Sequence, residues 1–362
     1  MTSVHPPFDV RIFHKEIKSL VRDGFEVSLI APSGGEGETD VRIVELDCSK
    51  SRLSRMSKTV FSVFIQALKQ KSDIYHFHDP ELIPCGFTLK LLGKRVIYDV
   101  HEDLPRQIVG KKWIPGLLKG PLSGVAGLME WFGGRFFSGV VAATPTIGDR
   151  FPVGKTEVVQ NFPDLNEFNN FESVPYADRE DTIVYVGGLA EIRGIYEMVS
   201  AIGASSQKKC RLKLAGGLPS VEISTKIADI PGNEKTDFLG WKNRDEIASL
   251  LGESKVGLVL LHPIENYKMS FPIKLFEYMA AGIPVVVSDF DLWRDIIEGA
   301  QCGLLVDPLD VSAVTEAIDW MLEHPVEAAE MGRRGRVAVE EKYNWANEEK
   351  KLFSLYTDIL EN

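Results

Sequence analysis

The hydrophobic residues of this 362-residue chain gather into short apolar runs, separated by segments with helical spacing. Six runs in the first half indicate buried strands: Phe25–Ala31, Val41–Leu46, Ile74–His78, Arg95–Asp99, Gly139–Ala143 and Thr156–Gln160. Six more follow: Thr182–Gly187, Arg211–Ala215, Thr236–Gly240, Val256–Leu261, Pro284–Ser288 and Gly303–Val306. Because strands that are apolar throughout alternate with helices, the pattern predicts an α/β fold of doubly wound parallel sheets, covered on both faces.

The two series of strands predict two domains, residues 1–165 and residues 182–342. Between the series, Asn161–Asp181 is rich in Asn, Pro, Asp and Glu and has little periodicity, which indicates a linker. Two such sheets are expected to place a cleft at the carboxyl ends of their strands, where ligands bind in this architecture.

The beginning of the chain departs from the usual pattern of a doubly wound domain, which opens with a strand, a glycine-containing loop and a helix. Here only Met1–Val4 precede the turn His5-Pro6-Pro7. A helix then follows, closed by Gly24, with apolar positions at Phe13, Ile17, Leu20 and Val21. The first strand is therefore expected to be very short or left out of this sequence, so that the sheet loses an inner strand.

The composition excludes several classes of protein. A chain with 44% hydrophobic and 26% charged residues is neither disordered nor fibrous, and no apolar run is long enough to span a bilayer. The net charge of −11 argues against non-specific binding of nucleic acid. Residues 1–160 carry 21 Lys and Arg against 18 Asp and Glu, whereas the remainder carries 20 against 34. The two halves are therefore expected to face different partners.

Neither a disulfide framework nor a metal site is predicted. The cysteines are widely spaced, at Cys48, Cys85, Cys210 and Cys302, which fits a reducing cytoplasm. The first residues lack the pattern of a secretory signal. The pair Asp289 and Asp291 is interpreted as a solvated loop, because two carboxylates alone are weak evidence for a metal.

One candidate site lies at the start of a predicted helix. A turn at Ser270–Pro272 opens this helix, which runs to about Ala281 and ends at Gly282. Free N–H groups at a helix start favour an anion, whereas Lys274 in the first turn opposes the helix dipole. A bound anion would account for this lysine, and Glu277 could bind ribose hydroxyls. The alternative is a capped core helix with both side chains solvated.

A second candidate site is the turn at Gly187 and Gly188, after a strand. Two glycines permit a close backbone approach or a positive φ, and the nearby Arg193 offers a two-pronged guanidinium to a phosphate. The spacing is not G-x-G-x-x-G, so a dinucleotide-binding fingerprint is not supported. A purely structural turn is the alternative.

A third candidate site is the polar cluster of His101, Glu102 and Asp103, which follows a strand end where this architecture gathers site residues. A histidine bonded to the backbone is the alternative. The cluster His76–Glu81 is interpreted as mainly structural, because Asp79-Pro80 can begin the next helix.

Two amphipathic stretches lie in the basic half. Ser49–Lys71 has an apolar stripe with basic residues near its start, and Lys111–Lys119 with Leu122–Phe137 is apolar, aromatic and basic. Both could lie on an anionic membrane surface, or their stripes could face the core. We interpret Leu122–Phe137 as facing the core and favour membrane contact for the Lys111–Lys119 loop.

Several segments resemble the family 4 retaining glycosyltransferases: Pro272–Val286, Tyr185–Gly194 and Gly303–Asp310. His5–Glu16 and Tyr98–Pro105 are similar to the branch of that family that makes bacterial cell-surface polysaccharides. The resemblance implies a GT-B-type fold of two Rossmann-like domains that face a cleft, the first binding the acceptor and the second the nucleotide sugar. It also implies that the last helix, within residues 343–362, crosses back to the first domain.

Carried over by position, the resemblance implies roles for individual residues. Arg193 and Lys274 would hold the donor diphosphate, and His101 would contact the transferred sugar. Glu277 would bind the ribose. The remaining donor-binding positions are Gly187, Gly188, Ser270, Phe271 and Pro272, and the acceptor side would include Glu102 and Asp103.

The resemblance thus implies transfer of a sugar, with retention and without a metal or other cofactor, from a nucleotide-diphosphate sugar to a glycan or lipid-linked acceptor. The expected location is the cytoplasm, with possible peripheral contact with the inner face of the plasma membrane. The family's first glutamate position is Met269 here, and its usual arginine is Gly188. Two alternatives therefore stay open, a sugar-nucleotide epimerase and a non-catalytic protein that binds sugar nucleotides.

Overall fold

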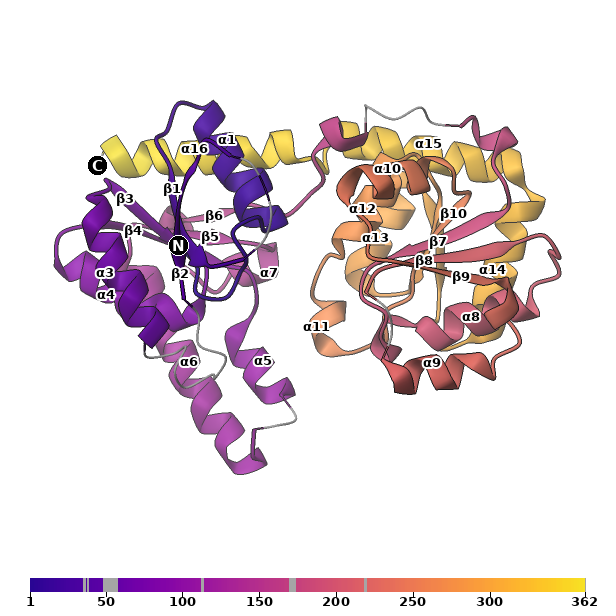
Figure 1. Ribbon diagram of the computed structural model, residues 1–362, viewed down its shortest axis with the longest axis horizontal. Helices are drawn as coiled ribbons and strands as arrows, with labels where there is room; N and C mark the ends of the chain where they lie inside the picture. Colours follow the sequence, from indigo (N-terminus) through magenta and orange to yellow (C-terminus); the bar gives the residue numbers. More distant parts are fainter. Residues whose placement is uncertain are drawn as a thin grey trace. The chain divides into compact units, whose positions relative to one another are not determined.

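A computed structural model describes residues 1–34, 37, 39–47, 58–111, 114–168, 174–217 and 220–361. The chain forms two compact units, one of Met1–Asn161 with Trp345–Asn362 and one of Phe162–Asn344 (Figure 1). Each of the twelve predicted strands is present at or near its expected bounds, and all strand pairs are parallel. The predicted α/β fold class is therefore confirmed.

The N-terminal unit contains two parallel sheets among its described residues. One joins β1 (Ser28–Pro32) to β2 (Arg42–Leu46), and the other has the order β3 (Ile74–Phe77), β4 (Arg95–Val100), β5 (Gly139–Ala142), β6 (Thr156–Val158). The longer helical elements of this unit are η1 (Val10–Ile17, a π-helix), α1 (Lys18–Arg22), α3 (Val60–Gln70), α4 (Ile83–Leu91), α5 (Leu104–Gly110), α6 (Gly116–Phe136) and α7 (Pro145–Gly148). Short 3-10 turns are η3 (Pro80–Leu82) and η4 (Val153–Lys155).

The last helix, α16 (Trp345–Glu361), belongs to this first unit. Its apolar stripe, which includes Leu352 and Leu355, packs against Ile97 of β4 and Val141 of β5. The indole of Trp345 donates a hydrogen bond to the Ser19 hydroxyl over 2.8 Å. The return of the chain to its first unit is thus fixed by buried apolar contact and by hydrogen bonds such as this one.

The C-terminal unit is built on one six-stranded sheet. Its order is β12 (Gly303–Val306), β11 (Val285–Ser288), β10 (Val256–Val259), β7 (Thr182–Val186), β8 (Arg211–Ala215), β9 (Thr236–Gly240). The helices are α8 (Ile195–Ala204), α9 (Val221–Ala228), α10 (Arg244–Gly252), α11 (Glu265–Lys268), α12 (Ile273–Ala280), α13 (Asp291–Ala300), α14 (Val311–Glu323) and α15 (Pro325–Glu341). Short 3-10 turns are η5 (Leu165–Phe168), η6 (Tyr176–Asp178), η7 (Glu191–Arg193) and η8 (Asn233–Lys235). Two apolar clusters fill the two faces of this sheet.

The boundary between the units lies at Asn161, before most of the expected linker. Phe162 is buried against Phe276 of α12, with ring centroids 4.7 Å apart, so it belongs to the second unit. Arg179 donates to the carbonyl of Ser254 over 2.7 Å and ties the end of the segment to the same unit. Residues 169–173 lie outside the described residues.

Near the N-terminus, the predicted helix is present as η1 and α1, and Gly24 follows with a φ of 96°. Phe13, Ile17 and Leu20 are buried as predicted, but Val21 is exposed because it lies outside the stripe that faces the sheet. Three cysteines, Cys85, Cys210 and Cys302, are buried free thiols, and Cys48 lies outside the described residues.

The prediction that Leu122–Phe137 faces the core is wrong for much of α6. Leu122, Val125, Leu128 and Phe132 are 45–57% exposed. The N-terminal half of α6, together with α5, extends beyond the sheet, so no strand lies against it (Figure 1). Ala126, Glu130, Gly133 and Gly134 are the buried residues of the helix. Among the described helices, none is long and apolar enough to cross a bilayer.

The stretch Ser49–Lys71 is described only from Lys58 onward. There, Val63 and Ala67 of α3 are buried in the core, which favours the core-facing alternative for this part of the stripe. In the Lys111–Lys119 loop, residues 112 and 113 lie outside the described residues. Lys119 donates to the carbonyl of Val109 over 2.8 Å.

Candidate functional site

In the C-terminal unit, Lys274 and Tyr185 form the centre of a basic site. The Nζ atom of Lys274 lies 3.6 Å from the centroid of the Tyr185 ring. It is buried and has no hydrogen-bond partner among the residues that the structure describes. Burial, and next the positive charge of Arg193, lower the pKa of Lys274 well below its usual value. An unpaired buried ammonium beside a second cation is costly unless a ligand supplies negative charge.

Arg193 comes to this lysine through the predicted glycine turn. β7 ends at Val186, and Gly187 follows with a φ of 138°, in the region that favours glycine. A Cβ at Gly187 would stand 2.8 Å from Lys274 Nζ, and one at Gly188 would stand 3.2 Å from an Nη atom of Arg193. The absence of side chains at both glycines leaves room for the two cations, so the predicted gathering of Arg193, Lys274 and the turn is present.

The hydroxyl groups of two tyrosines lie beside the Arg193 guanidinium. Burial lowers the pKa of Arg193, but Tyr185 and Tyr267 outweigh it and raise the value above its usual range. The Tyr185 hydroxyl also donates to the carbonyl of Gly188 over 3.0 Å, which ties the ring to the turn. The sequence motifs did not single out either tyrosine as a site residue. The nearest signal is that Tyr185 stands two residues before the glycine pair.

The predicted helix start at Ser270–Pro272 is confirmed, since α12 begins at Ile273 and Gly282 follows it with a φ of 68°. Pro272 stands at the N-cap and supplies no side-chain cap, so the first amides of the helix are not satisfied in that way. The carbonyl of Ser270 accepts a bond from the Trp293 indole over 2.8 Å, and Phe271 packs on Phe276. These contacts hold the loop in place.

Glu277 is buried on α12 and is engaged by an arginine that the motifs did not reveal. Arg244, at the start of α10, donates to a carboxylate oxygen of Glu277 over 2.7 Å and also pairs with Glu167. Burial lowers the pKa of Arg244, but the carboxylates of Glu277 and Glu167 outweigh it and raise the value. Arg244 thus fixes the orientation of Glu277, whose role toward ribose stays a prediction.

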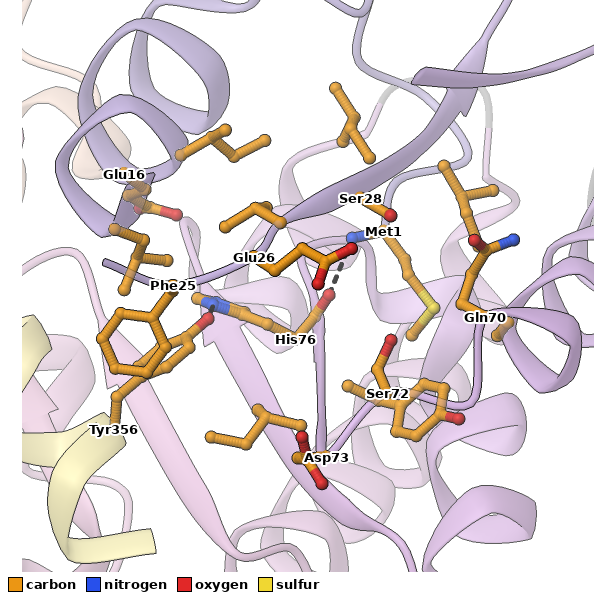
Figure 2. Close-up of a pocket in the computed structure, with 18 of the residues that line it drawn as sticks. Met1, Glu16, Phe25, Glu26, Ser28, Gln70, Ser72, Asp73, His76 and Tyr356 are labelled. Carbon is orange, nitrogen blue, oxygen red and sulfur yellow. Dashed lines mark hydrogen bonds between the residues drawn. The ribbon is translucent and has the colours of Figure 1, made fainter. Parts of the chain in front are cut away.

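In the N-terminal unit, His101 joins a buried network at the carboxyl ends of β3 and β4. Its Nε2 lies 3.2 Å from an Asp99 oxygen and 3.2 Å from Nδ1 of His78. His76 Nδ1 lies 2.8 Å from the Tyr356 hydroxyl of α16 (Figure 2). His78, from the segment His76–Glu81 that was interpreted as mainly structural, thus belongs to the same buried network as His101. The carboxyl ends of adjacent parallel strands lie at the same edge of a sheet. Since His78 follows β3 and His101 follows β4, the sequence alone could have placed the two histidines side by side.

Arg11 neutralises the acidic part of this network. It donates to Asp99 over 3.2 Å and lies 2.9 Å from Glu16. Burial raises the pKa of Asp99, but Arg11 and His101 outweigh it and hold the value well below its usual range. Burial and then Asp99 raise the pKa of Glu16 well above its usual value, while burial lowers that of His78. The directions of these shifts favour the charged form of Asp99 and the neutral forms of Glu16 and His78.

A metal ion is the other group that such a set could bind. Ligand atoms of Glu16, His78, Asp99 and His101 lie within 4.8 Å of one another, a spacing compatible with one cation. However, the Arg11 guanidinium already contacts both carboxylates, and its charge would repel a metal at the same place. The donor set therefore fits a hydrogen-bond network better than a metal centre.

The two acidic residues assigned to the acceptor side have different surroundings. Glu102 is exposed, whereas Asp103 accepts from the backbone N–H of Arg106 as the cap of α5 and pairs with Arg150 over 3.1 Å. Asp79 accepts from the Thr2 hydroxyl over 2.7 Å. Asp289 pairs with Arg294, and Asp291 is the first residue of α13; both aspartates are exposed.

Two family models match adjoining parts of the chain. The model described as Glycosyltransferase Family 4 matches residues 10–167, and the model described as Glycosyl transferases group 1 matches residues 166–338. The chain belongs to the family 4 glycosyltransferases. The second match contains the basic site of Arg193 and Lys274, and the first contains the network around His101.

Curated relatives of this glycosyltransferase are distant. The chain is 27% identical over 222 residues to an uncharacterized glycosyltransferase of Methanocaldococcus jannaschii, a match that covers 58% of this chain and 56% of the relative. It is 23% identical over 290 residues to a D-rhamnosyltransferase of Pseudomonas aeruginosa, covering 76% of this chain and 71% of the relative. For the first relatives, the chain spans about half of their length.

Solved structures show the same fold at low identity. A glycosyltransferase from Rickettsia africae matches with a TM-score of 0.73 and 15% identity, over 99% of this chain and 97% of that one. The Anabaena protein HepE in complex with UDP-glucose matches with a TM-score of 0.71 and 14% identity, over 95% and 94%. The likeness shows that the two Rossmann-like units of this glycosyltransferase form a GT-B-type fold.

Proposed function

We propose that this glycosyltransferase transfers a sugar, with retention and without a metal, from a nucleotide-diphosphate sugar to a glycan or lipid-linked acceptor of the cell surface. The observation that carries the proposal is the unpaired, buried ammonium of Lys274 beside Arg193 and the Gly187-Gly188 turn. Two basic side chains beside the start of a helix suit the negative charge of a diphosphate.

The chemistry follows from the charge that develops on the leaving group. As the bond between the anomeric carbon and the diphosphate oxygen breaks, negative charge grows on that oxygen. Arg193, Lys274 and the start of α12 supply fixed positive charge to it, so catalysis is mainly electrostatic. The acceptor hydroxyl forms its bond to the anomeric carbon on the face that the diphosphate leaves, and its proton passes to the diphosphate oxygen.

The network around His101 is assigned to the sugar and the acceptor. Asp99 holds His101 at 3.2 Å and is itself neutralised by Arg11, so the imidazole is oriented by a buried charge. An oriented imidazole that is 18% exposed can still bond to a sugar hydroxyl. Glu102, which is exposed on the same loop, is assigned to the acceptor side.

Contact with an anionic membrane surface is proposed for α6 and the adjoining Lys111–Lys119 loop. The exposed face of α6 carries Leu118, Leu122, Val125 and Phe132, spaced by three, four or seven residues along the helix. Glu130 is the acidic residue of α6, and it is buried. An apolar groove of about 460 Å³ between α4 and α6 is lined by Phe87, Leu91, Leu128, Met129, Phe132 and Phe136. A helix face of this kind would bring the enzyme to lipid-linked acceptors.

The donor is identified by a panel of nucleotide sugars scored for binding by ligand-detected NMR. Arg193→Ala and Lys274→Ala are then compared with the wild type for binding of the selected donor and for release of nucleotide diphosphate with an acceptor. We expect each substitution to reduce turnover by at least about tenfold, because each removes a charged hydrogen bond. Matched controls are Arg333→Ala and Lys226→Ala, both at exposed positions, which should leave turnover unchanged.

The alternatives predict different outcomes of the same assay. A sugar-nucleotide epimerase of the hydrolysing kind would release free nucleotide diphosphate and an epimerised sugar without any acceptor, because water takes the place of the acceptor. A non-catalytic protein would bind the nucleotide sugar and transfer nothing to any acceptor. Unchanged turnover in folded Arg193→Ala and Lys274→Ala proteins would exclude the basic site as the donor site.

A further inference from the structure

The turn that carries Arg193 packs directly on the end of β10. Gly194 follows Arg193 with a φ of 74°, and a Cβ there would stand 2.2 Å from the carbonyl oxygen of Leu260. On the other side of Arg193, the carbonyl of Ile192 accepts from the backbone N–H of His262 over 3.0 Å. The 3-10 turn η7 and the residues that follow β10 are therefore joined through their backbones, both before and after Arg193.

The ring of His262 extends this contact into α8. Its Nε2 lies 3.1 Å from a carboxylate oxygen of Glu197, in the first turn of α8, so the ring N–H donates to the carboxylate. The two side chains are 17% and 15% exposed, which keeps most of the water away from the bond. Among the described residues, His262 is the one hydrogen-bond partner of this carboxylate, and the second oxygen is buried without any. Without the imidazole, the carboxylate would be left unpaired at the start of the helix that follows Arg193.

The segment that begins with His262 also carries two further parts of the basic site. Tyr267 of α11, whose hydroxyl lies beside the Arg193 guanidinium, comes next along it. Lys274 follows in the first turn of α12. His262 thus lies where the connection from β10 to α12 leaves the sheet, and it bonds this connection to both η7 and α8.

The backbone around Arg193 has few side chains that could fix its place. Gly187 and Gly188 form the turn beside it and Gly194 follows it, so none of these residues can anchor η7 by packing. A guanidinium supports a leaving diphosphate only while it stays aimed at the developing charge, and a displacement of about 1 Å can reduce the rate by about 100-fold. The position of Arg193 therefore depends on bonds from neighbouring elements, of which His262 supplies one to the turn and one to the helix after it.

We propose that His262 is a positioning residue of the donor site, which joins η7 and α8 to the end of β10 and thereby holds Arg193 toward the diphosphate. The imidazole acts through Glu197 and Arg193 and does not touch the donor. Its catalytic consequence rests on the proposed function, whereas its effect on Arg193 can be measured without any substrate. A neutral N–H at the place of Nε2 is sufficient for this role, so the side chain of glutamine can replace the ring.

The first test measures the reactivity of Arg193 in the ligand-free protein. Phenylglyoxal modifies accessible guanidinium groups, and mass spectrometry follows its rate at Arg193 in the wild type, His262→Ala and His262→Gln. We expect modification to be at least about tenfold faster in His262→Ala and close to the wild-type rate in His262→Gln, because only alanine loses the bond to Glu197. The matched control is His324→Ala, which removes another ring of the same unit, bonded to the carbonyl of Trp320 over 2.8 Å. An unchanged rate in His262→Ala would overturn the proposal, as would an equal increase in His324→Ala.

A second pair of variants covers the case in which His262→Ala loses its fold. Glu197→Ala removes the partner of the imidazole and leaves the backbone bond of His262 in place, whereas Glu197→Gln keeps an acceptor. Arg179, which is buried in the same unit, is the internal reference, since general unfolding would raise its rate together with that of Arg193. We expect faster modification of Arg193 alone in Glu197→Ala, and wild-type rates in Glu197→Gln. An equal rise at both arginines in both alanine variants would show a purely structural role and overturn the proposal.

The third test measures the same role in catalysis, with the donor that the panel of nucleotide sugars selects. His262→Ala should lower kcat/KM for this donor by at least about tenfold in the wild type but by less than about twofold in Arg193→Ala, because the residue that it positions is then absent. His262→Gln should restore most of the loss. Equal losses in the two backgrounds would contradict positioning through Arg193. If the wild type transfers no sugar, the proposed function fails, and the modification rate of Arg193 still decides whether His262 positions it.

Discussion

The ammonium of Lys274 lies 3.6 Å from the centre of the Tyr185 ring and has no hydrogen-bond partner among the described residues. A cation over an aromatic face is stabilised by the ring, but this contact does not replace the hydration that a buried ammonium loses. Arg193, close by, repels it further. The placing of Lys274 beside Arg193 is therefore unfavourable without a ligand and favourable with a bound diphosphate.

Lys274→Met should stabilise the ligand-free protein and weaken nucleotide binding. The substitution removes a buried amino group that has no hydrogen-bond partner among the described residues and keeps a side chain of similar length, so we expect the free energy of unfolding to rise by about 1 kcal/mol. Thermal unfolding measures the first effect, and titration with the selected nucleotide diphosphate measures the second. Lys226→Met, at an exposed position of α9, is the control. A Lys274→Met protein that is less stable and binds normally would contradict the assignment.

Binding of the diphosphate should be accompanied by proton uptake. The pKa of Lys274 is lowered in the free protein by burial and by Arg193, and a bound anion would raise it again. The complex therefore binds more protons than the free protein does. The affinity for the nucleotide diphosphate should fall as the pH rises above the lowered pKa of Lys274 in the free protein. Calorimetry in buffers of different ionisation enthalpy measures this uptake, which should disappear in Lys274→Met. No proton uptake in the wild type would show that Lys274 is already fully charged before binding.

Gly187→Ala should damage both the turn and the basic site. The φ of 138° is unfavourable for alanine, at a cost of about 1–2 kcal/mol, and the new Cβ would stand 2.8 Å from Lys274 Nζ. We expect a lower Tm and at least about a tenfold loss in affinity for the nucleotide diphosphate. Gly154→Ala, where no atom lies within 4 Å of the added Cβ, is the matched control. Normal binding by Gly187→Ala would mean that the turn does not position the cations.

Charges on the exposed face of α6 should abolish membrane binding without unfolding the protein. Leu128 and Phe132 are 57% and 53% exposed, so Leu128→Glu with Phe132→Glu adds carboxylates where an anionic bilayer would lie. Sedimentation with anionic vesicles at low salt should show at least about a tenfold loss of binding, with unchanged turnover on a water-soluble acceptor. Val153→Glu, at a position 93% exposed in the same unit, is the control and should bind as the wild type does. No binding by the wild type would reject membrane contact itself.

The sequence determined the features of this protein that depend on local pattern. The twelve strands, the bounds of α12 and the glycine turn before Arg193 follow from apolar runs, helix signals and the conformational freedom of glycine. The gathering of Arg193 and Lys274 was also within reach, because strand ends and helix starts meet at one edge of a parallel sheet.

Only the tertiary structure decided which surface each of these elements meets. Helical spacing shows that Leu122 and Val125 share a face, but it does not show whether another element covers that face, and here none of the described elements does. His78 and Arg244 gain their partners from distant segments, His101 and Glu277. Met1 likewise gains its partners from a distant segment, since its amino group donates to the carbonyl of His76 and its carbonyl accepts from the N–H of His78. A one-dimensional pattern records which residues lie together along an element, whereas burial, pairing and pKa depend on what packs against it.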